Sequence, residues 1–350
     1  MIAARGFAAH GPTSPLVPHA FERRDPGPHD VVIRIRYSGI CHSDIHQAHD
    51  DWGDSIYPMV PGHEIVGSVE AVGADVKRVR PGDRAGVGCM VDSCRTCASC
   101  REGLEQYCDD GATWTYNDRE RGSERPTYGG YSDVIVVDEA FVVTVPESLD
   151  FAAAAPLLCA GITTWSPLRH WKVGAGQVAG VVGLGGLGHM GVKFARALGA
   201  HVVAITTSPA KAAEAERLGA HEVLLSTDSA AMEAGKKRFD FLLDTVPNAH
   251  DVNPYLQLLR RDASMVIVGA LKVLSPELEG GNLIGGRKRL SGSGIGGIRE
   301  TQEMLDFCGT HGITSDVEVI GMGAVNDAWR RVLASDVRYR FVIDMATLGR

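Results

Sequence analysis

Short apolar runs broken by glycine, proline and aspartate characterise residues 1–150. Examples rich in valine and isoleucine are Asp30–Tyr37 (DVVIRIRY), Glu64–Val72 and Tyr131–Val137. Runs of this kind, bounded by residues that favour turns, are typical of β-strands. The first 150 residues are therefore predicted to be β-rich. The polar residues 102–130, with alternating charges in Asn117–Arg125, are predicted to form a long solvated loop.

From about residue 155 the pattern changes to apolar runs that alternate with helical ones. The predicted helices are Gly186–Leu198, ended by Gly199, and Pro209–Leu218, with Ser208 as N-cap and Gly219 after its last residue. The predicted strands are Gln177–Val182, His201–Thr206, Asp240–Asp244 and Ser264–Val268. Alternating strands and helices predict a parallel sheet covered on both faces.

The tail of the chain returns to a mixed pattern. Residues 297–350 contain two helical stretches and the apolar run Arg340–Met345, which could be a strand that joins the first, β-rich part. A length of 350 residues is typical of about two domains.

Composition narrows the class of protein. Hydrophobic residues make up 44%, and 35 Lys and Arg against 43 Asp and Glu give a net charge of −8. This balance argues against nucleic-acid and membrane-surface partners. We see no secretory signal, and Val178–Val192 is too short and glycine-rich for a membrane span. We expect a cytoplasmic, reducing location, where the eight cysteines are metal ligands or catalytic groups rather than disulfides.

The sequence Gly183-Leu184-Gly185-Gly186-Leu187-Gly188 fits the dinucleotide-binding pattern G-x-G-x-x-G between a predicted strand and a predicted helix. Glycines there allow a tight turn, approach of a pyrophosphate and close helix–strand packing. The helix N-terminus would bind the phosphates. The alternative is a glycine-rich turn in another sheet protein.

The end of the second predicted strand selects the cofactor. An acidic residue about 20 positions after the loop would favour NAD, but Thr206-Thr207-Ser208-Pro209-Ala210-Lys211 contains none. Three hydroxyls, a helix N-terminus and Lys211 suit the extra phosphate of NADP(H), which we predict over NAD(H). Ser208 could instead be only a helix cap, or serve both purposes.

Four cysteines lie close together as C-x2-C-x2-C-x7-C; they are Cys94, Cys97, Cys100 and Cys108. Four thiolates on one loop can surround a structural Zn²⁺. An iron–sulfur cluster is the rival, but the ferredoxin run ends C-x3-C-P, whereas Asp109 follows the last cysteine here. We predict a structural zinc that holds an otherwise poorly ordered lobe.

Cys41, His63 and Cys159 are dispersed, and spacing alone does not make them ligands, because a lone buried cysteine is usually a small hydrophobe. However, Gly62-His63-Glu64-x2-Gly67-x5-Gly73-x2-Val76 resembles the signature of zinc-containing alcohol dehydrogenases of the medium-chain dehydrogenase/reductase superfamily. Further stretches resemble its cinnamyl-alcohol-dehydrogenase-like branch, and these are residues 57–64 (YPMVPGHE), 87–94 (VGCMVDSC), 244–247 (DTVP) and 336–342 (DVRYRFV).

The resemblance covers nearly the whole chain and implies an α/β fold of two domains. Residues 1–155 and 297–350 would form a GroES-like, β-rich catalytic domain, and residues 156–296 a doubly wound Rossmann domain for NADP. The resemblance also implies a homodimer and a small-molecule alcohol or aldehyde as substrate.

The resemblance implies that Cys41, His63 and Cys159 bind a catalytic zinc, which polarises a carbonyl for hydride attack from the nicotinamide. Ser43 would bond the substrate oxygen, and His46 would pass the proton to solvent, although His46 could also be a surface histidine. Glu64 would lie near the metal and Asp44 would orient His63. Cys89 and Cys308 have no matched role and are expected to be buried or inert.

The cofactor and substrate contacts are also implied by the resemblance. His42 would contact a cofactor phosphate, or nothing; the other implied cofactor residues, besides the loop and Thr206–Lys211, are Thr163, Thr245, Gly269, Ser293 and Ile295. Trp52 and Trp114 would line the substrate pocket, or only pack their loops. Gly294 stands where plant enzymes often have Phe, which predicts a more open pocket.

We therefore expect an NADP(H)-dependent alcohol dehydrogenase and aldehyde reductase that acts on a broad range of primary alcohols and aldehydes, aromatic ones included. One alternative is a related reductase of iminium or conjugated C=C bonds, against which Ser43, His46 and Glu64 argue. Another is a non-catalytic NADP- and zinc-binding protein, against which the dispersed ligand set argues.

Overall fold

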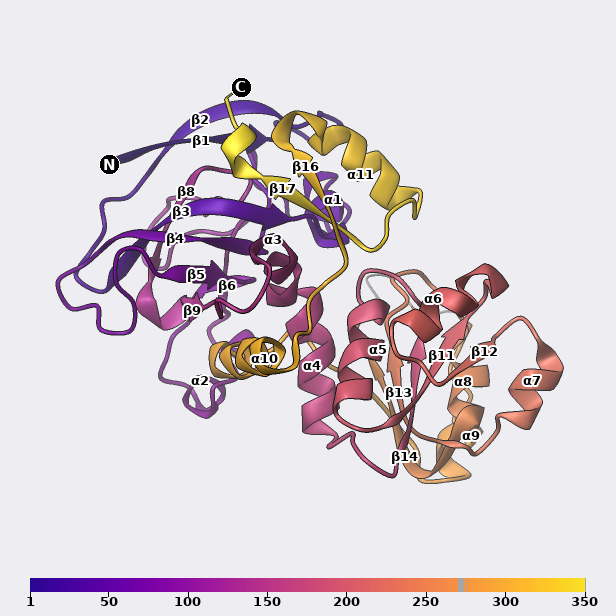
Figure 1. Ribbon diagram of the computed structural model, residues 1–350. Coiled ribbons are helices and arrows are strands. Elements are labelled where there is room, and N and C mark those ends of the chain that lie inside the picture. Colours follow the sequence, from indigo (N-terminus) through magenta and orange to yellow (C-terminus); the bar gives the residue numbers. More distant parts are fainter. Residues whose placement is uncertain (270–273, 275, 350) are drawn as a thin grey trace. The chain divides into compact units, whose positions relative to one another are not determined.

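The computed structural model describes residues 1–269, 274 and 276–349. The chain forms two compact units: unit 1 is Met1–Cys159 with Gly296–Arg350, and unit 2 is Ala160–Ile295 (Figure 1). The sequence had placed the first boundary at 155/156, and the structure places it at 159/160. The shift has a structural reason: the short helices α3 (Phe151–Ala154) and η3 (Ala155–Leu158) pack on the sheet of unit 1.

Unit 1 is built around a seven-stranded sheet in the order β16-β17-β3-β4-β5-β9, with β8 also paired to β3. The strands are β3 (Asp30–Gly39), β4 (Ile65–Val72), β5 (Arg84–Val87), β8 (Val134–Asp138), β9 (Val143–Thr144), β16 (Val317–Gly321) and β17 (Arg340–Asp344). β17 pairs antiparallel with β3, Val342 opposite Gly39. The prediction that the C-terminal apolar run joins the first domain is confirmed.

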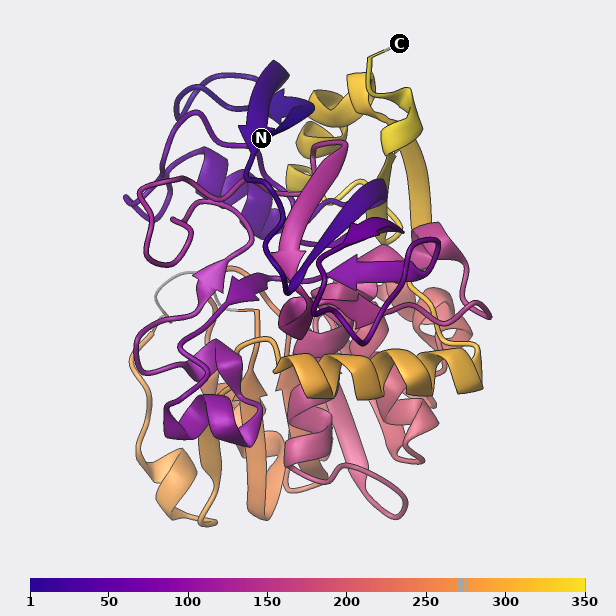
Figure 2. The same ribbon diagram turned by 90° about the vertical axis from the view of Figure 1, so that its left-hand side faces the viewer.

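Further elements surround this sheet. Two smaller sheets join β1 (Ile2–Ala8) to β2 (Val17–Arg23) and β6 (Met90–Asp92) to β7 (Thr113–Trp114). The helices are α1 (His42–Ala48), α2 (Ala98–Glu102), α10 (Ile298–His311) and α11 (Val325–Leu333), with 3-10 turns η1 (Glu105–Tyr107), η2 (Glu139–Phe141), η5 (Met322–Ala324) and η6 (Met345–Thr347). The long orange helix α10 is seen lengthwise in Figure 2. It packs beside β9, where Thr144 N–H donates to Gln302 Oε1 at 2.8 Å.

The polar segment 102–130 is more ordered than predicted. It contains η1 and β7, and Thr113, Thr115 and Tyr116 are buried. The prediction of a solvated loop is wrong for these residues because β7 pairs with β6, a partner that the local sequence does not reveal.

Unit 2 is a six-stranded parallel sheet in the order β12-β11-β10-β13-β14-β15. Its strands are β10 (Val178–Val182), β11 (His201–Thr206), β12 (Glu222–Leu225), β13 (Phe239–Asp244), β14 (Leu259–Ile267) and β15 (Arg289–Gly292). Counted within the unit, this order is 3-2-1-4-5-6, the doubly wound arrangement that binds dinucleotides at the point where the order reverses. The predicted parallel sheet is confirmed.

Helices connect these strands. They are α4 (Ala160–His170), α5 (Gly188–Ala197), α6 (Ala212–Arg217), α7 (Ser229–Ala234), α8 (Asn253–Leu258) and α9 (Gly281–Ile284). The predicted helix 209–218 begins as a 3-10 turn, η4 (Pro209–Lys211). Ser208 occupies its N-cap position with extended backbone, but its side chain makes no capping hydrogen bond. The predicted N-cap position is therefore confirmed, without the side-chain hydrogen bond that a serine cap usually accepts.

Within the described ranges, no single helix is long and apolar enough to cross a membrane. One bent pair, Phe151–Leu158 with Ala160–His170, reaches that length and composition only when its two members are taken together.

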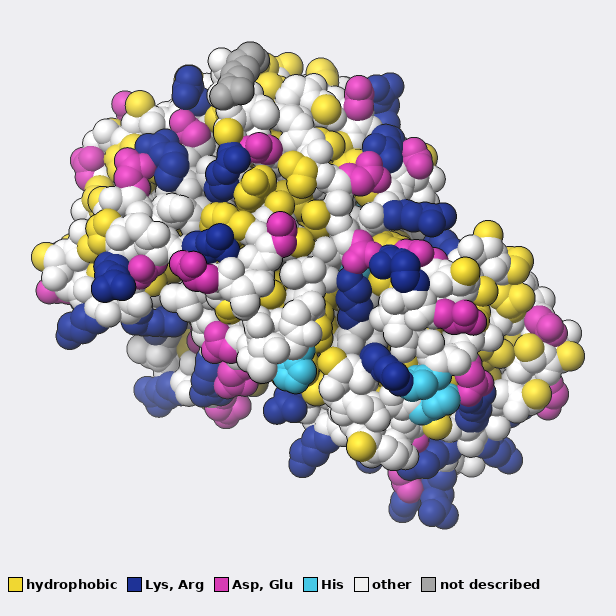
Figure 3. Space-filling view, viewed as in Figure 1, with side chains coloured by type: hydrophobic (Ala, Val, Ile, Leu, Met, Phe, Trp, Pro, Cys, Tyr) yellow, Lys and Arg dark blue, Asp and Glu magenta, His cyan; other side chains and the backbone are white. Residues whose placement is uncertain are grey.

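On the face shown in Figure 3, basic and acidic side chains lie interspersed. Ion pairs at the surface of the molecule include Arg34 Nε with Glu70 Oε2 at 2.7 Å and Arg217 with Glu214. Exposed pairs of this kind each contribute at most about 1 kcal/mol to stability.

Candidate metal centres and cofactor loop

The first candidate metal ligand stands where β3 ends and α1 begins. Cys41 is the N-cap residue of α1, and Asp44 Oδ2 accepts a hydrogen bond from the Cys41 N–H at 2.9 Å. Gly39, two residues earlier, must lack a side chain, because a Cβ there would lie 1.9 Å from Glu64 Oε2. The close packing of this turn therefore sets the direction in which the Cys41 thiol points.

His63 lies in the segment just before β4. Its Nδ1 is 3.0 Å from Asp44 Oδ1, and its ring stacks on Tyr116 with centroids 5.8 Å apart and planes 16° from parallel. Because Nδ1 is engaged by the carboxylate, Nε2 is the nitrogen left for a metal. The predicted pairing of Asp44 with His63 is present, whereas Tyr116 was not predicted.

Cys159 follows the 3-10 turn η3 and completes the set. Its Sγ lies 4.0 Å from Cys41 Sγ. The ligand atoms of Cys41, His63, Glu64 and Cys159 all lie within 4.8 Å of one another, and all four residues are buried. The structure thus brings the dispersed residues together from three separate segments of unit 1.

The donor set fits a zinc ion. Two thiols and one imidazole are the Cys₂His ligands of catalytic zinc sites, which keep a fourth position open. Zn–S bonds of about 2.3 Å in tetrahedral geometry require sulfurs about 3.8 Å apart, close to the observed 4.0 Å. The hydrogen bond between the two thiols holds the pKa of Cys41 well below its usual range and raises the pKa of Cys159 well above it, so Cys41 is the member of the pair that ionises first. A low thiol pKa favours the thiolate that binds metal.

Glu64 borders the same set. It forms a buried ion pair with Arg340 of β17, and within the described residues its Oε2 has no hydrogen-bond partner. Burial raises the pKa of Glu64 to about 7, although the charge of Arg340 opposes the shift. The sequence predicted Glu64 near the metal but missed Arg340, which stands inside the stretch DVRYRFV.

Cys89 is the thiol that sequence reasoning left without a role. Its Sγ lies 3.9 Å from the Leu158 carbonyl oxygen, and a hydrogen bond with Cys159 lowers its pKa. Cys89 is therefore a neighbour of the ligand set. Its position in the sequence, between β5 and β6, does not reveal this proximity. Cys308, by contrast, is buried on α10, and its thiol lies 3.7 Å from Met304 Sδ.

The predicted relay and pocket residues lie on and after α1. Ser43 is partly exposed in its first turn, and His46 Nδ1 lies 2.5 Å from Asp51 Oδ2. The Trp52 ring is 6.1 Å from that of His46 and is 41% exposed. Trp114 is 43% exposed on β7, not in a loop as predicted. The structure groups Trp52 with His46.

The second cluster is local. The Sγ atoms of Cys94, Cys97, Cys100 and Cys108 all lie within 4.8 Å of one another. Backbone N–H groups point at the sulfurs: Cys97 N donates to Cys94 Sγ at 3.3 Å and Cys94 N to Cys108 Sγ at 3.4 Å. The backbone donors of Thr96 and Cys97 lower the pKa of Cys94 to about 6. Four thiols in this arrangement fit a closed, structural zinc site.

The glycine loop joins β10 to α5. Gly183 has φ +88°, which favours glycine, and a Cβ on Gly188 would lie 2.0 Å from the Gly183 carbonyl oxygen. A Cβ on Gly185 would meet no described atom within 4 Å. The first and third glycines are thus required by the fold, and the second borders open space that a pyrophosphate would fit.

The end of β11 carries the residues predicted to select NADP(H). Thr206 Oγ1 accepts a hydrogen bond from Ser208 N at 3.2 Å, and Lys211 Nζ lies 2.9 Å from the Leu184 carbonyl oxygen. Lys211 therefore connects the η4 turn to the glycine loop, and Thr207 lies exposed between them. The structure places this hydroxyl-rich segment beside the loop, as a site for an extra phosphate requires.

The remaining predicted cofactor residues are scattered. Thr245 follows β13, and its hydroxyl donates to the Val182 carbonyl at 2.8 Å. A Cβ on Gly269 would lie 2.4 Å from Thr245 backbone. Thr163 is buried on α4, Ser293 follows β15, Ile295 has φ +35°, and His42 is the first residue of α1. Among these residues, Thr245 contacts the glycine loop, since its hydroxyl also lies 3.2 Å from the Gly183 carbonyl oxygen, and Gly269 packs on Thr245.

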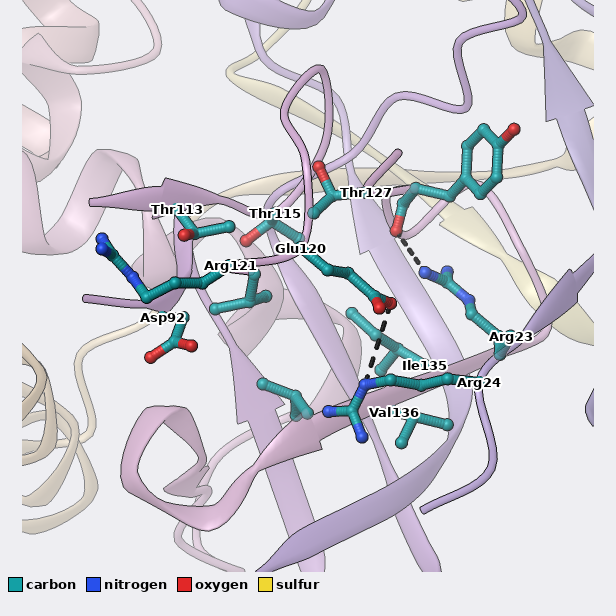
Figure 4. A pocket seen from close by; sticks show the side chains of 13 residues that line it. Arg23, Arg24, Asp92, Thr113, Thr115, Glu120, Arg121, Thr127, Ile135 and Val136 are labelled. Carbon is teal, nitrogen blue, oxygen red and sulfur yellow. Dashed lines mark hydrogen bonds and ion pairs between the residues drawn. The ribbon is translucent and has the colours of Figure 1, made fainter. Parts of the chain in front are cut away.

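A separate polar cavity of about 220 Å³ lies in unit 1 (Figure 4), and among the described residues its lining includes no member of either cysteine cluster. Arg24 lies 3.8 Å from Glu120, and Arg23 donates to the carbonyls of Tyr128 and Val134. Burial lowers the pKa of Arg23 to about 10. Because these cations are already satisfied, we assign the cavity no ligand.

Comparison with known families agrees with this geometry. The family described as alcohol dehydrogenase GroES-like domain matches residues 27–147, and that described as zinc-binding dehydrogenase matches residues 186–310.

Individual relatives match over nearly the whole chain. The aldehyde reductase YahK from Escherichia coli (strain K12) is 52% identical, covering 98% of this chain and 99% of the relative. A cinnamyl alcohol dehydrogenase (SbCAD4) from Sorghum bicolor is 48% identical with a TM-score of 0.95 over 98% of both chains. The structure of CAD from Helicobacter pylori complexed with NADP(H) is 41% identical, with a TM-score of 0.92 over 99% of both chains.

Proposed function

Because this chain belongs to the zinc-containing alcohol dehydrogenases of the medium-chain dehydrogenase/reductase superfamily, in their cinnamyl-alcohol-dehydrogenase-like branch, and is an alcohol oxidoreductase, we propose that it transfers a hydride between NADP(H) and a primary alcohol or aldehyde. The observation that carries this proposal is the buried Cys41, His63 and Cys159 set, whose ligand atoms lie within 4.8 Å of one another.

The proposed chemistry divides between bound groups and residues of the chain. A zinc ion held by Cys41, His63 and Cys159 would supply a Lewis acid for the substrate oxygen, and NADPH would supply the hydride. Ser43, on the first turn of α1, is proposed to donate a hydrogen bond to that oxygen. His46, paired with Asp51 at 2.5 Å, is proposed to exchange the proton with solvent.

The preference for NADP(H) is supported by the end of β11. An acidic side chain there would repel a 2′-phosphate, and Thr206–Lys211 has none. Lys211 is near enough to the loop for its ammonium to bind a phosphate, because its Nζ already reaches the Leu184 carbonyl. The relative from Helicobacter pylori was solved with NADP(H).

We propose a second zinc at Cys94, Cys97, Cys100 and Cys108, where it would hold the lobe that contains α2 and η1 in place. The proposed substrates are broad and include benzyl- and cinnamyl-type aldehydes. Partly exposed indoles at Trp52 and Trp114 support that range, as does the small Gly294.

The experiment that tests the function is NADPH oxidation by the purified protein with benzaldehyde, cinnamaldehyde and short aliphatic aldehydes, with and without a chelator. We expect turnover of several aldehydes, loss of activity on chelation and restoration by Zn²⁺. NADH in place of NADPH is the matched control. Equal kcat/KM with NADH would contradict the cofactor proposal, and full activity after removal of all zinc would contradict the metal proposal.

We also propose that the protein is a homodimer in a reducing, cytoplasmic location. The edge strand β15 of unit 2 has no neighbour on its outer side among the described strands, and Ile284 nearby is 84% exposed. Pairing of two such edges would cover this apolar residue. All eight cysteines are free thiols, as a reducing compartment requires. Light scattering would test the dimer; Ile284→Asp is expected to shift it to monomer.

A further inference from the structure

A tyrosine lies directly beneath the carboxylate that holds His63. Tyr131 is completely buried, and its hydroxyl is 3.2 Å from Asp44 Oδ2. Asp44 in turn contacts His63 Nδ1 at 3.0 Å. The tyrosine hydroxyl is therefore two hydrogen bonds from the imidazole that faces the proposed metal.

Asp44 depends on a small number of donors. Its Oδ1 accepts from His63 Nδ1 and from Gly62 N–H at 3.1 Å, and its Oδ2 accepts from Cys41 N–H and the Tyr131 hydroxyl. Tyr116 also shares a side-chain hydrogen bond with Asp44. The side chain is completely buried, so water cannot replace a lost donor. A buried carboxylate that loses a donor is poorly satisfied and can rotate away from its remaining partners.

The position of Tyr131 is fixed by the segment that carries His63. Tyr131 N–H donates to the Pro61 carbonyl at 2.9 Å. Its ring packs so closely on Gly62, whose φ is +107°, that a Cβ there would lie 2.7 Å from a ring carbon. Displacement of the hydroxyl would therefore disturb the residues on either side of it.

Trp329 on α11 sets the direction of the Tyr131 hydroxyl. Its Nε1 donates to the Tyr131 oxygen at 3.4 Å, and the two rings lie 6.4 Å apart. An indole N–H can only donate, so the tyrosine oxygen accepts here and its own proton remains for Asp44. The chain of donors runs from Trp329 through Tyr131 and Asp44 to His63, and it lies entirely within unit 1.

We propose that Tyr131 is a positioning residue for the metal ligand His63. It acts through Asp44, and Trp329 orients its hydroxyl. The tyrosine does not touch the reacting atoms; it keeps the carboxylate in the place where His63 presents Nε2 to the metal. This inference rests on the proposed zinc at Cys41, His63 and Cys159.

The test is zinc release from the intact holoenzyme to the dye 4-(2-pyridylazo)resorcinol, with Cys159→Ser identifying the phase that belongs to the Cys41 set. Tyr131→Phe removes only the hydroxyl. We expect release from the Cys41 set to become about 10-fold faster, since partners of metal ligands typically change metal affinity by 10–100-fold. Release from the Cys94–Cys108 cluster is expected to stay unchanged and provides an internal control.

Tyr57→Phe is the matched control variant, because its hydroxyl donates to the Ala48 carbonyl at 2.8 Å and makes no contact with Asp44 in the structure. It should leave both release phases unchanged. In cobalt-substituted protein, Tyr131→Phe but not Tyr57→Phe should shift the visible absorption of the metal. A folded Tyr131→Phe variant with wild-type release rates and absorption would overturn the proposal.

Two further variants keep the test decisive. In an Asp44→Ala background, which has no side-chain acceptor, Tyr131→Phe should add nothing to the release rate. An additive effect would show that the tyrosine acts by another route and would also overturn the proposal. If Tyr131→Phe does not fold, Trp329→Phe is measured in its place. We then expect zinc release from the Cys41 set to become about twofold faster. A wild-type protein without zinc at the Cys41 set would instead refute the proposed function itself.

Discussion

The two cysteine clusters of unit 1 are assembled in opposite ways. Cys94, Cys97, Cys100 and Cys108 come from one short segment, and backbone N–H groups surround their sulfurs. Cys41, His63 and Cys159 come from the end of β3, the start of β4 and the turn η3, and buried side chains surround them. The first cluster can order its own loop, whereas the second requires the sheet to be complete.

The selection of a metal ion has a different origin in each cluster. The ligands of a local cluster are separated by a few residues. The loss of chain entropy on bringing them together is therefore small. A dispersed cluster needs groups that hold each ligand, here Asp44 and Tyr116 for His63 and Arg340 beside Glu64. We therefore expect loss of a ligand to affect stability in the first cluster and chemistry in the second.

The largest expected effect is on activity. Cys159→Ser should abolish most turnover, by about 10³-fold or more, because a Lewis acid contributes several kcal/mol to catalysis. The protein should keep one zinc per chain and nearly the wild-type Tm. Steady-state kinetics and metal analysis on one preparation check this, and kcat within tenfold of wild type would contradict it.

The matching change in the other cluster is Cys97→Ser. Here we expect a decrease of about 3 kcal/mol or more in the free energy of unfolding, which corresponds to roughly 6–12 °C in Tm. The kcat of the folded fraction at low temperature should stay within a few-fold of wild type. Thermal unfolding followed by circular dichroism measures the first quantity. An unchanged Tm would show that this cluster does not support the lobe.

Removal of the carboxylate beside His63 should have an effect of intermediate size, on the affinity for zinc. Asp44→Asn is expected to weaken zinc at the Cys41 set by 10–100-fold, because Asp44 fixes the orientation of the imidazole. Asp92→Asn, next to the local cluster, is the control, and it should leave the Cys41 zinc unchanged. Competition with a chelator of known affinity gives both values. Equal effects of the two variants on that zinc would contradict the assignment.

Chelation should separate the clusters without mutation. A small chelator is expected to remove one of two zincs first, with loss of activity, because three protein ligands leave an open position and four thiolates do not. The Tm should change little at that stage. If activity disappears only when the second zinc leaves, the open and closed assignments are reversed.

The smallest expected effect is on the pH dependence of stability, and it concerns an aspartate–histidine pair in unit 2. His250 Nε2 lies 2.8 Å from the buried Asp244 Oδ2 in unit 2, and that hydrogen bond raises the pKa of His250. A raised folded-state pKa means that the stabilisation is full below pH about 6.5 and is lost as pH rises through the folded-state value. We expect the pair to contribute about 1 kcal/mol to the free energy of unfolding at low pH.

His250→Gln should remove this pH dependence between pH 6 and 8 and leave zinc content unchanged. Urea unfolding at several pH values measures it, and a wild-type profile in the variant would contradict the assignment. This pair therefore shows what a buried carboxylate does for a histidine that belongs to neither candidate metal cluster of the described residues.

Much of unit 2 could be predicted from the sequence because its signals are local. β11 was predicted at its observed bounds, and in the glycine loop Gly183 has a positive φ and Gly188 makes a close backbone contact, as expected of a dinucleotide-binding loop. Ser208 stands at the predicted N-cap position, but its side chain does not cap the 3-10 turn η4. In unit 1 the local cluster was visible in its spacing, but Cys41, His63 and Cys159 depended on family resemblance.

What could not be predicted depends on contacts between distant segments. Burial of Tyr116 follows from its stacking on His63, and the role of Arg340 follows from β17 lying beside β3. Cys89 acquires its neighbours only when η3 folds back near β5. The spacing of apolar residues predicts strands and helices but not which distant side chains meet. These contacts are made by polar or small residues that do not stand out in their own strand or loop.

The position of β17 also has a consequence for biosynthesis. On the ribosome, unit 2 emerges complete before Arg340 has been translated, so the inserted unit can fold while the enclosing one still lacks its last paired strand. Until then Glu64 lacks Arg340, the buried cation with which it forms an ion pair. The surroundings of the buried ligand set are therefore completed late in synthesis. A nascent chain stalled before residue 340 would have the Cys94–Cys108 cluster, but the set of Cys41, His63 and Cys159 would lack the neighbouring Glu64–Arg340 ion pair.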